Sequence, residues 1–278
     1  MELIQIIILG IIQGLTEFLP VSSSGHLILT PLVLNLQDQG LALDAILHLG
    51  TLMAILIFFK KDLFNIFLGL FDKKRDTNRV AWCIVAASFP AGLIGLFFGD
   101  WIESSLRNPT FVAVNLLFWS LILYMADRSG KSKIKPKSEL QELNFSQIFF
   151  IGCAQAIALL PGTSRSGITI AAGLFSNLNH TTATRFSFLL GAPIIFAAGM
   201  YKLITFMSAP NALQQYTHLD LIVGLGISFL VGLLAIKLLL QVVEKLGLFP
   251  FIVYRVLLAA AILFYYHGYK LTKKAALI

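Results

Sequence analysis

"TEFLPVSSSGHL", residues 16–27, interrupts an apolar segment with a glutamate, a proline, three serines, a glycine and a histidine. Proline cannot continue the hydrogen-bond ladder of a helix, and it disfavours helix in the residue before it. The flanking apolar pieces, residues 3–19 and 24–34, are each shorter than the roughly 20 residues that span a bilayer. The stretch therefore predicts a helix broken at Pro20 and a re-entrant pair of half-helices, surrounded by protein or by a wet cavity.

The composition places this pair in a membrane. Of the 278 residues, 57% are hydrophobic and 13% are charged, and the mean hydropathy is +0.83, far above that of soluble domains. We expect an all-α polytopic membrane protein forming one integral membrane domain over residues 1–278. Apolar stretches long enough to cross a bilayer predict six spans, at residues 42–59, 80–99, 111–126, 183–207, 219–237 and 248–268.

A second interruption, "PGTSRSGIT" at residues 161–169, lies between apolar pieces at 146–160 and 165–177. The two halves of the chain, about 1–126 and 146–268, match at one constant offset: Gly10, Gln13 and Ser24-Gly25 correspond to Gly152, Gln155 and Ser166-Gly167. In each half the interrupted segment precedes three spans. Because three is odd, we expect the second half to be inverted in the membrane and the two broken segments to meet near its middle.

The net charge of +7 is concentrated in two connections, residues 60–79 and 127–145. Cytoplasmic loops of membrane proteins carry an excess of Lys and Arg. Both loops are therefore expected inside the cell, and the basic charge indicates topology and not nucleic-acid binding.

The second break carries an anion-binding pattern. Ser164, Arg165 and Ser166 open a half-helix, where backbone N–H groups without partners and the positive end of the helix dipole attract anions. Arg165 adds a planar set of donors suited to phosphate. A charge at this depth is costly and is usually functional.

The first break repeats the pattern with Ser22, Ser23 and Ser24. His26 lies in the first turn of the following helix, where the dipole disfavours its protonated form, so a neutral imidazole could act as base or nucleophile. Serines at a helix start are ordinarily caps, and for Ser22 capping and phosphate binding are equally supported.

Gln13 and Glu17 share one helix face, with Glu17 in the last turn, where the dipole opposes a carboxylate. Such a violation of local rules tends to mark a functional site. Three roles stay open: Glu17 could hold a divalent cation, orient His26 or pair with Arg165.

Together these groups suit phosphoryl transfer, in which positioning and charge neutralisation supply most of the catalysis. The substrate would be a phosphorylated lipid or would reach the site through the bilayer. The alternative is a transporter or flippase of such a lipid, because inverted repeats with broken helices are also a transporter architecture. Glu17 and His26 beside the anion site favour an enzyme. The remaining intramembrane polar residues are expected in interfacial, structural or backbone-satisfying roles: Asp44, His48, Arg185, Asn115, Gln155 and Lys202.

Both motifs, "QGLTEFLPVSSSGH" and "PGTSRSGIT", resemble the two signatures of bacterial undecaprenyl-diphosphatases of the bacitracin-resistance type. The resemblance covers nearly the whole chain. It implies hydrolysis of undecaprenyl diphosphate to undecaprenyl phosphate and inorganic phosphate, which recycles the lipid carrier for peptidoglycan and other cell-wall polymers. It further implies a bacterial cytoplasmic membrane, with the active site toward the outer face. The oligomeric state is open, with a homodimer among the alternatives.

The resemblance also assigns residues. Glu17, Ser23, His26 and Arg165 carry over as catalytic, with Ser23 the favoured nucleophile and His26 its base or a rival nucleophile. Mg²⁺ or Ca²⁺ is implied as activator, held by Glu17 with Gln13 nearby. The phosphate-binding set comprises Ser22, Ser24, Gly162, Ser164, Ser166 and Thr169.

Overall fold

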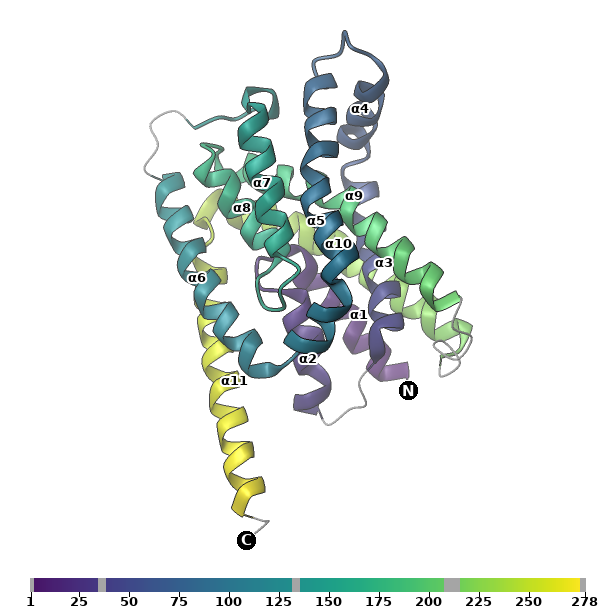
Figure 1. Ribbon diagram of the computed structural model, residues 1–278, viewed down its shortest axis with the longest axis vertical. Coiled ribbons are helices and arrows are strands. Elements are labelled where there is room, and N and C mark those ends of the chain that lie inside the picture. The colour runs from purple at the N-terminus through teal and green to yellow at the C-terminus, as the bar shows by residue number, and fades with distance from the viewer. Residues whose placement is uncertain (1–2, 35–38, 132–135, 208–215, 276–278) are drawn as a thin grey trace.

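The computed structural model describes residues 3–34, 39–131, 136–207 and 216–275, and these form an all-α protein (Figure 1). The helices are α1 (Leu3–Phe18), α2 (Ser23–Leu34), α3 (Gly40–Phe58), α4 (Lys60–Phe71), α5 (Asn78–Leu106), α6 (Pro109–Lys131), the short 3₁₀ helix η1 (Leu140–Glu142), α7 (Phe145–Ile157), α8 (Arg165–Phe175), α9 (His180–Met207), α10 (His218–Leu246) and α11 (Phe249–Ala275).

Within these residues, five helices are long and apolar enough to cross a membrane: α5, α6, α9, α10 and α11. A sixth candidate is the pair α3 and α4, which passes the same test together but bends by 84° between the two helices. These elements match the six predicted spans, and the prediction of a polytopic helical membrane protein is confirmed.

The segment 60–79, predicted as a loop, is helical in its first half. Phe64, Phe67 and Phe71 recur at helical spacing along α4 and are all exposed, so an apolar face runs along the helix beside the basic residues at its start. An exposed amphipathic helix of this kind suits a membrane interface. The connection after α4 and the C-terminal end of α6 both lie in the upper half of the view in Figure 1, so the two basic segments lie toward the same end of the molecule.

The two broken segments have the predicted half-helices. Figure 1 shows α1 and α2 in the lower half of the view and α7 and α8 in the upper half. The first break runs from Phe18 to Ser23 as expected, but α7 ends at Ile157 and not at residue 160. The reason is a change of bonding pattern: the amides of residues 158–160 donate to carbonyls three residues back, which tightens the helix end into 3₁₀ turns.

Both breaks end in the same turn. Ser22 and Ser164 each have a φ of 75°, a conformation that non-glycine residues rarely adopt. Their hydroxyls accept hydrogen bonds from Gly25 N at 3.3 Å and Gly167 N at 3.2 Å, respectively. The matching turns support the predicted repeat, while its inversion across the membrane stays a prediction.

Close helix contacts hold the half-helices in place. A Cβ added to Gly14 of α1 would lie 2.7 Å from Val231 Cβ of α10, and one on Gly152 of α7 would lie 2.3 Å from Ala87 O of α5. Small residues of this kind let membrane helices approach closely.

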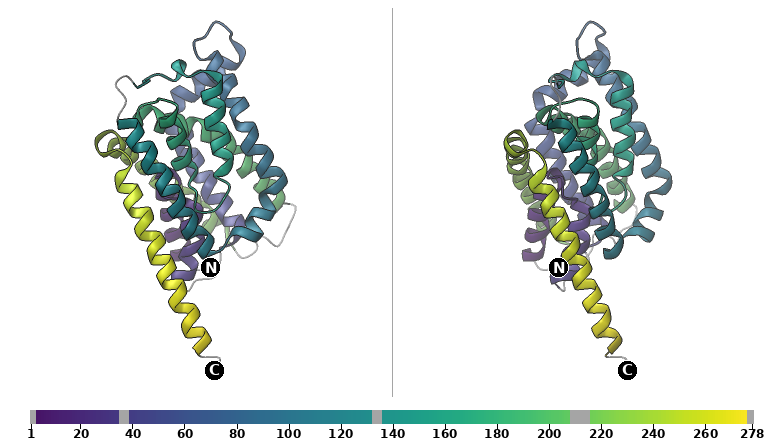
Figure 2. Two further views of the ribbon diagram at one scale, coloured as in Figure 1. Left: turned by 60° about the vertical axis from the view of Figure 1, so that its left-hand side comes forward. Right: turned by 90° about the vertical axis from the view of Figure 1, so that its left-hand side faces the viewer.

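The helices α6 and α11 also lie side by side, as the views of Figures 1 and 2 show.

Candidate active site

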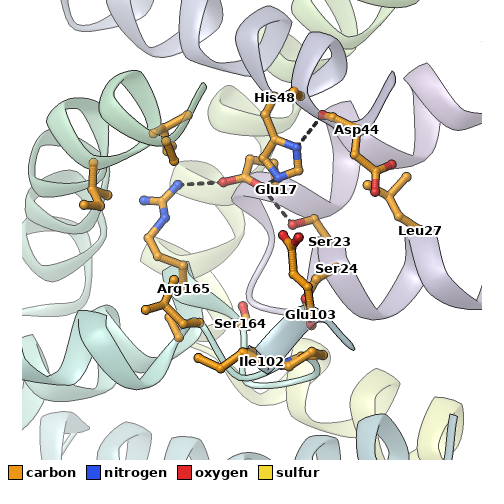
Figure 3. Close-up of a pocket in the computed structure, with 18 of the residues that line it drawn as sticks. Glu17, Ser23, Ser24, Leu27, Asp44, His48, Ile102, Glu103, Ser164 and Arg165 are labelled. Atoms are coloured by element: carbon orange, nitrogen blue, oxygen red, sulfur yellow. Dashed lines mark hydrogen bonds and ion pairs between the residues drawn. The ribbon is translucent and has the colours of Figure 1, made fainter. Parts of the chain in front are cut away.

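The two breaks are joined by an ion pair. Arg165, the first residue of α8, donates from Nη2 to Oε1 of Glu17 in the last turn of α1, at 3.0 Å (Figure 3). Their side chains are 12% and 6% exposed, respectively. Of the three roles predicted for Glu17, the structure therefore contains the pairing with Arg165.

The second carboxylate oxygen of Glu17 gathers three further groups. Oε2 accepts hydrogen bonds from Ser23 Oγ at 2.8 Å and Gln13 Nε2 at 3.2 Å, and His48 Nε2 lies 3.6 Å away. Figure 3 shows Ser23 and His48 converging on Glu17 from α2 and α3. The carboxylate is thus the centre of the cluster and is in position to take the proton of the Ser23 hydroxyl.

The guanidinium of Arg165 is fixed on a second side. Its Nη1 donates to Ser187 O of α9 at 3.0 Å. A Cβ on Gly191, one turn further along α9, would lie 2.1 Å from Nη1, so this glycine makes room for the guanidinium. Nε is buried and has no hydrogen-bond partner among the described residues.

A cavity of about 290 Å³ opens onto this cluster. The predicted residues that line it are Glu17, Ser22, Ser23, Ser24, Ser164 and Arg165. The lining also contains two ion pairs: Arg107 Nη2 lies 3.4 Å from Asp44 Oδ2, and Lys202 pairs with Glu103. The side chains of Lys202 and Glu103 are 29% and 32% exposed, so we take this part of the lining as the mouth. The cavity therefore joins a buried anion-binding cluster to a polar rim.

Ser166 and Thr169 do not line the cavity. Their hydroxyls instead bond neighbouring segments that do or that hold lining residues. Ser166 Oγ donates to Leu19 O of the first break at 3.2 Å. Thr169 Oγ1 lies 2.6 Å from Ser187 Oγ. The carbonyl of the same Ser187 accepts the hydrogen bond from Arg165. Gly162 has a φ of 91° and likewise lies outside the lining.

His26 does not line the cavity either. Its Nδ1 lies 2.7 Å from Ser22 O and its Nε2 lies 2.8 Å from the hydroxyl of Tyr254 of α11. Because a carbonyl only accepts, Nδ1 carries the proton and Nε2 of the neutral ring accepts from Tyr254. In this arrangement both ring nitrogens are engaged, and Glu17 is the group that holds the Ser23 hydroxyl.

Arg255 of α11 holds the backbone of both breaks, and sequence reasoning missed it. It is 0% exposed and donates to Pro20 O at the first break and to Gly162 O at the second, each at 3.2 Å. It also donates to Leu116 O and Ser120 Oγ of α6. One buried guanidinium thus hydrogen-bonds the backbone of both breaks. An arginine inside the predicted span 248–268 was the sequence feature that could have indicated this role.

His48 and Asp44 were expected in interfacial or structural roles, yet both line the cavity. His48 Nδ1 donates to Asp44 O at 2.7 Å, which leaves Nε2 on the side of Glu17 (Figure 3). Their spacing on one helix face of an apolar span was the available signal.

The residues around Glu17 fit a divalent cation that also binds the substrate. No group of three or more His, Cys, Asp or Glu side chains suited to a metal occurs in the described part of the chain. Oε1 of the buried Gln13, however, has no hydrogen-bond partner there and lies beside one carboxylate. Mg²⁺ is commonly held by one or two carboxylates together with substrate phosphates, and this donor set suits that arrangement.

Comparisons with known proteins identify the family of the chain. The model of the family "Bacitracin resistance protein BacA" matches residues 6–261. Undecaprenyl-diphosphatase 1 of Pseudoalteromonas translucida is 41% identical over 268 residues, covering 95% of this chain and 98% of the relative. Undecaprenyl-diphosphatase 2 of Stutzerimonas stutzeri is 41% identical over 273 residues, covering 96% and 100%. The undecaprenyl-diphosphatase of Campylobacter concisus is 38% identical over 269 residues, covering 95% and 99%. The chain belongs to the bacitracin resistance protein BacA family.

Proposed function

We propose that this protein removes the terminal phosphate of undecaprenyl diphosphate, releasing inorganic phosphate and leaving undecaprenyl phosphate. The observation that carries the proposal is the Ser23 hydroxyl held 2.8 Å from the Glu17 carboxylate beside Arg165, inside a cavity between membrane helices. The relatives named undecaprenyl-diphosphatase support it.

The terminal phosphate binds between the starts of α2 and α8. Both helices begin at the cavity, and the first-turn N–H groups of a helix attract anions. Arg165 contributes the positive charge and planar donors that suit phosphate oxygens. These groups stabilise the charge that develops on the transferring phosphoryl group.

Ser23 then attacks the terminal phosphorus. The Ser23 Oγ–P bond forms, the bridging P–O bond breaks, the prenyl phosphate leaves, and the hydroxyl proton passes to Glu17. Water next attacks the phosphoserine; the Oγ–P bond breaks, inorganic phosphate leaves and Ser23 regains a proton from Glu17. His26, which lies outside the cavity lining, is not needed as the base in this scheme.

Mg²⁺ or Ca²⁺ would be held by Glu17 and by Oε1 of Gln13, and when bound it would neutralise charge on the diphosphate.

The active site opens toward the outer face of the cytoplasmic membrane. The mouth residues Glu103, Arg107 and Lys202 lie near the C-terminal ends of α5 and α9. The start of α5 follows the first basic segment, at the upper end of the view in Figure 1. His180, the first residue of α9, pairs with Asp127 beside the second basic segment. Basic segments favour the cytoplasm. The mouth is therefore at the opposite face.

The test is phosphate release by purified protein in detergent, from undecaprenyl diphosphate, with added Mg²⁺ or Ca²⁺ and with EDTA. We expect release with cation and little with EDTA. A quench in acid with substrate labelled on the terminal phosphate separates the nucleophiles, because phosphoserine survives acid and phosphohistidine does not. Absence of release by the wild type would refute the hydrolase; movement of intact diphosphate across vesicle membranes would then favour the flippase.

A further inference from the structure

Gln155, in the last turn of α7, is a buried side chain without a structural task. It is 2% exposed and lines the cavity. Neither its Nε2 nor its Oε1 has a hydrogen-bond partner among the described residues. Buried amides are nearly always hydrogen-bonded because an unpaired polar group is costly. The sequence expectation that Gln155 satisfies backbone groups therefore has no support in the structure.

The corresponding residues of the first half show why this amide has no partner. Gln155 corresponds to Gln13, whose Nε2 donates to Glu17 Oε2 at 3.2 Å and Thr51 Oγ1 at 3.4 Å. The positions that correspond to Glu17 and Thr51 in the second half are occupied by Leu159 and Ala192. The second half thus keeps the amide and replaces both of its acceptors with apolar side chains.

The cavity lining that includes Gln155 has an apolar part. Its members include Ala91, Ala158, Leu159, Ile194 and Ile195. A wall of this kind suits a prenyl chain, whereas Ser23 and Arg165 lie at the helix starts that bind the terminal phosphate. Gln155 therefore marks the part of the cavity where a diphosphate headgroup would join its chain.

We propose that Gln155 binds the phosphate that carries the prenyl chain, with Nε2–H donating to a non-bridging oxygen. This inference rests on the proposed function, and it makes Gln155 a substrate-binding residue that recognises a prenyl-linked phosphate. A neutral amide supplies this bond without adding a charge to the apolar wall.

The test compares Gln155→Leu with wild type, using undecaprenyl diphosphate as substrate and farnesyl monophosphate and inorganic phosphate as inhibitors. Loss of a hydrogen bond to a charged group is expected to raise KM about tenfold, with kcat little changed because the bond is present before and during the reaction. The inhibition constant of farnesyl monophosphate rises by a similar factor. That of inorganic phosphate, which binds at Arg165, stays at the wild-type value.

Two further measurements separate substrate binding from a role in the fold. Removal of an unpaired buried amide leaves the melting temperature unchanged or raises it, whereas loss of a structural hydrogen bond lowers it. Gln155→Asn keeps a carboxamide but shortens the side chain. We expect it to raise the inhibition constant of farnesyl monophosphate, as Gln155→Leu does. The matched control is Trp119→Phe: Nε1 of Trp119 is also buried without a partner, but Trp119 lies outside this cavity, so its KM stays unchanged.

An active wild type with unchanged KM in Gln155→Leu would overturn this inference and leave the hydrolase intact. Equal weakening of farnesyl monophosphate and inorganic phosphate, or a fall in melting temperature, would also overturn it. A wild type that releases no phosphate is a failure of the proposed function itself and refutes both.

Discussion

Glu17 and Arg165 lie 148 residues apart in the chain, and Arg165 Nη2 donates to Glu17 Oε1 at 3.0 Å. The pair joins the end of α1 to the start of α8, so it spans both helix breaks. Burying an ion pair costs desolvation energy that the attraction between the charges only partly offsets. The presence of this pair between the two helix breaks is therefore better explained by function than by stability. In the proposed mechanism Arg165 binds the phosphate, and Glu17 holds the Ser23 hydroxyl that attacks it.

Arg165→Lys should separate charge from geometry. Lysine keeps the positive charge but cannot donate to Glu17 and Ser187 as a planar fork. We expect kcat to fall by roughly 10²–10³-fold, the loss typical when a transition-state donor is removed. The measurement is steady-state phosphate release together with the melting temperature. Arg185→Lys is the matched control, because Arg185 pairs with Asp62 at an exposed position. Near-normal turnover in Arg165→Lys would show that the planar donor set of Arg165 is not required for catalysis.

The helix breaks were predictable from sequence because their signals are local. Pro20 and Pro161 mark where the two breaks lie, and the hydroxyls of Ser22 and Ser164 after them cap the next helices. The bend between α3 and α4 and the early end of α7 were not predictable. Both depend on how the chain packs, and no residue type marks them.

The candidate site was predictable in its members but not in its pairings. Sequence left three roles open for Glu17, since the distance to Arg165 exists only in the folded chain. His48, Gln155 and Arg255 were hidden for a related reason. Each is a single polar residue in an apolar helix, and only the surrounding helices decide whether it faces a cavity, a carbonyl or another side chain.

Gln13→Glu should strengthen activation by divalent cations. The change adds a second carboxylate where Oε1 of Gln13 has no partner among the described residues. We expect the Mg²⁺ or Ca²⁺ concentration for half-maximal activity to fall severalfold, whereas Gln13→Leu should raise it. The titration starts from enzyme treated with EDTA. An identical cation dependence in all three proteins would place the cation away from Gln13.

Arg255→Met should destabilise the fold more than it alters substrate binding. The guanidinium donates to carbonyls at both breaks, and removing the donor leaves these acceptors buried and unpaired. A cost of about 3 kcal/mol or more is expected, seen as a lower melting temperature in detergent. Arg255→Lys should recover part of it. Arg128→Gln is the control, because Arg128 bonds only the exposed Tyr124 among the described residues. An unchanged melting temperature would show that the breaks hold their shape without Arg255.

Labelling of single cysteines should place the cavity mouth outside the cell. With Cys83 and Cys153 replaced by alanine, Asp76→Cys reports on the connection between α4 and α5, and Ser105→Cys reports on the end of α5 beside the mouth residue Glu103; both positions are exposed. Because basic segments stay in the cytoplasm, an impermeant maleimide added to spheroplasts should label Ser105→Cys and spare Asp76→Cys until the membrane is permeabilised. Phosphate release by each variant confirms that it is folded. The reverse labelling pattern would place the mouth, and with it the hydrolysis of the lipid, on the cytoplasmic side.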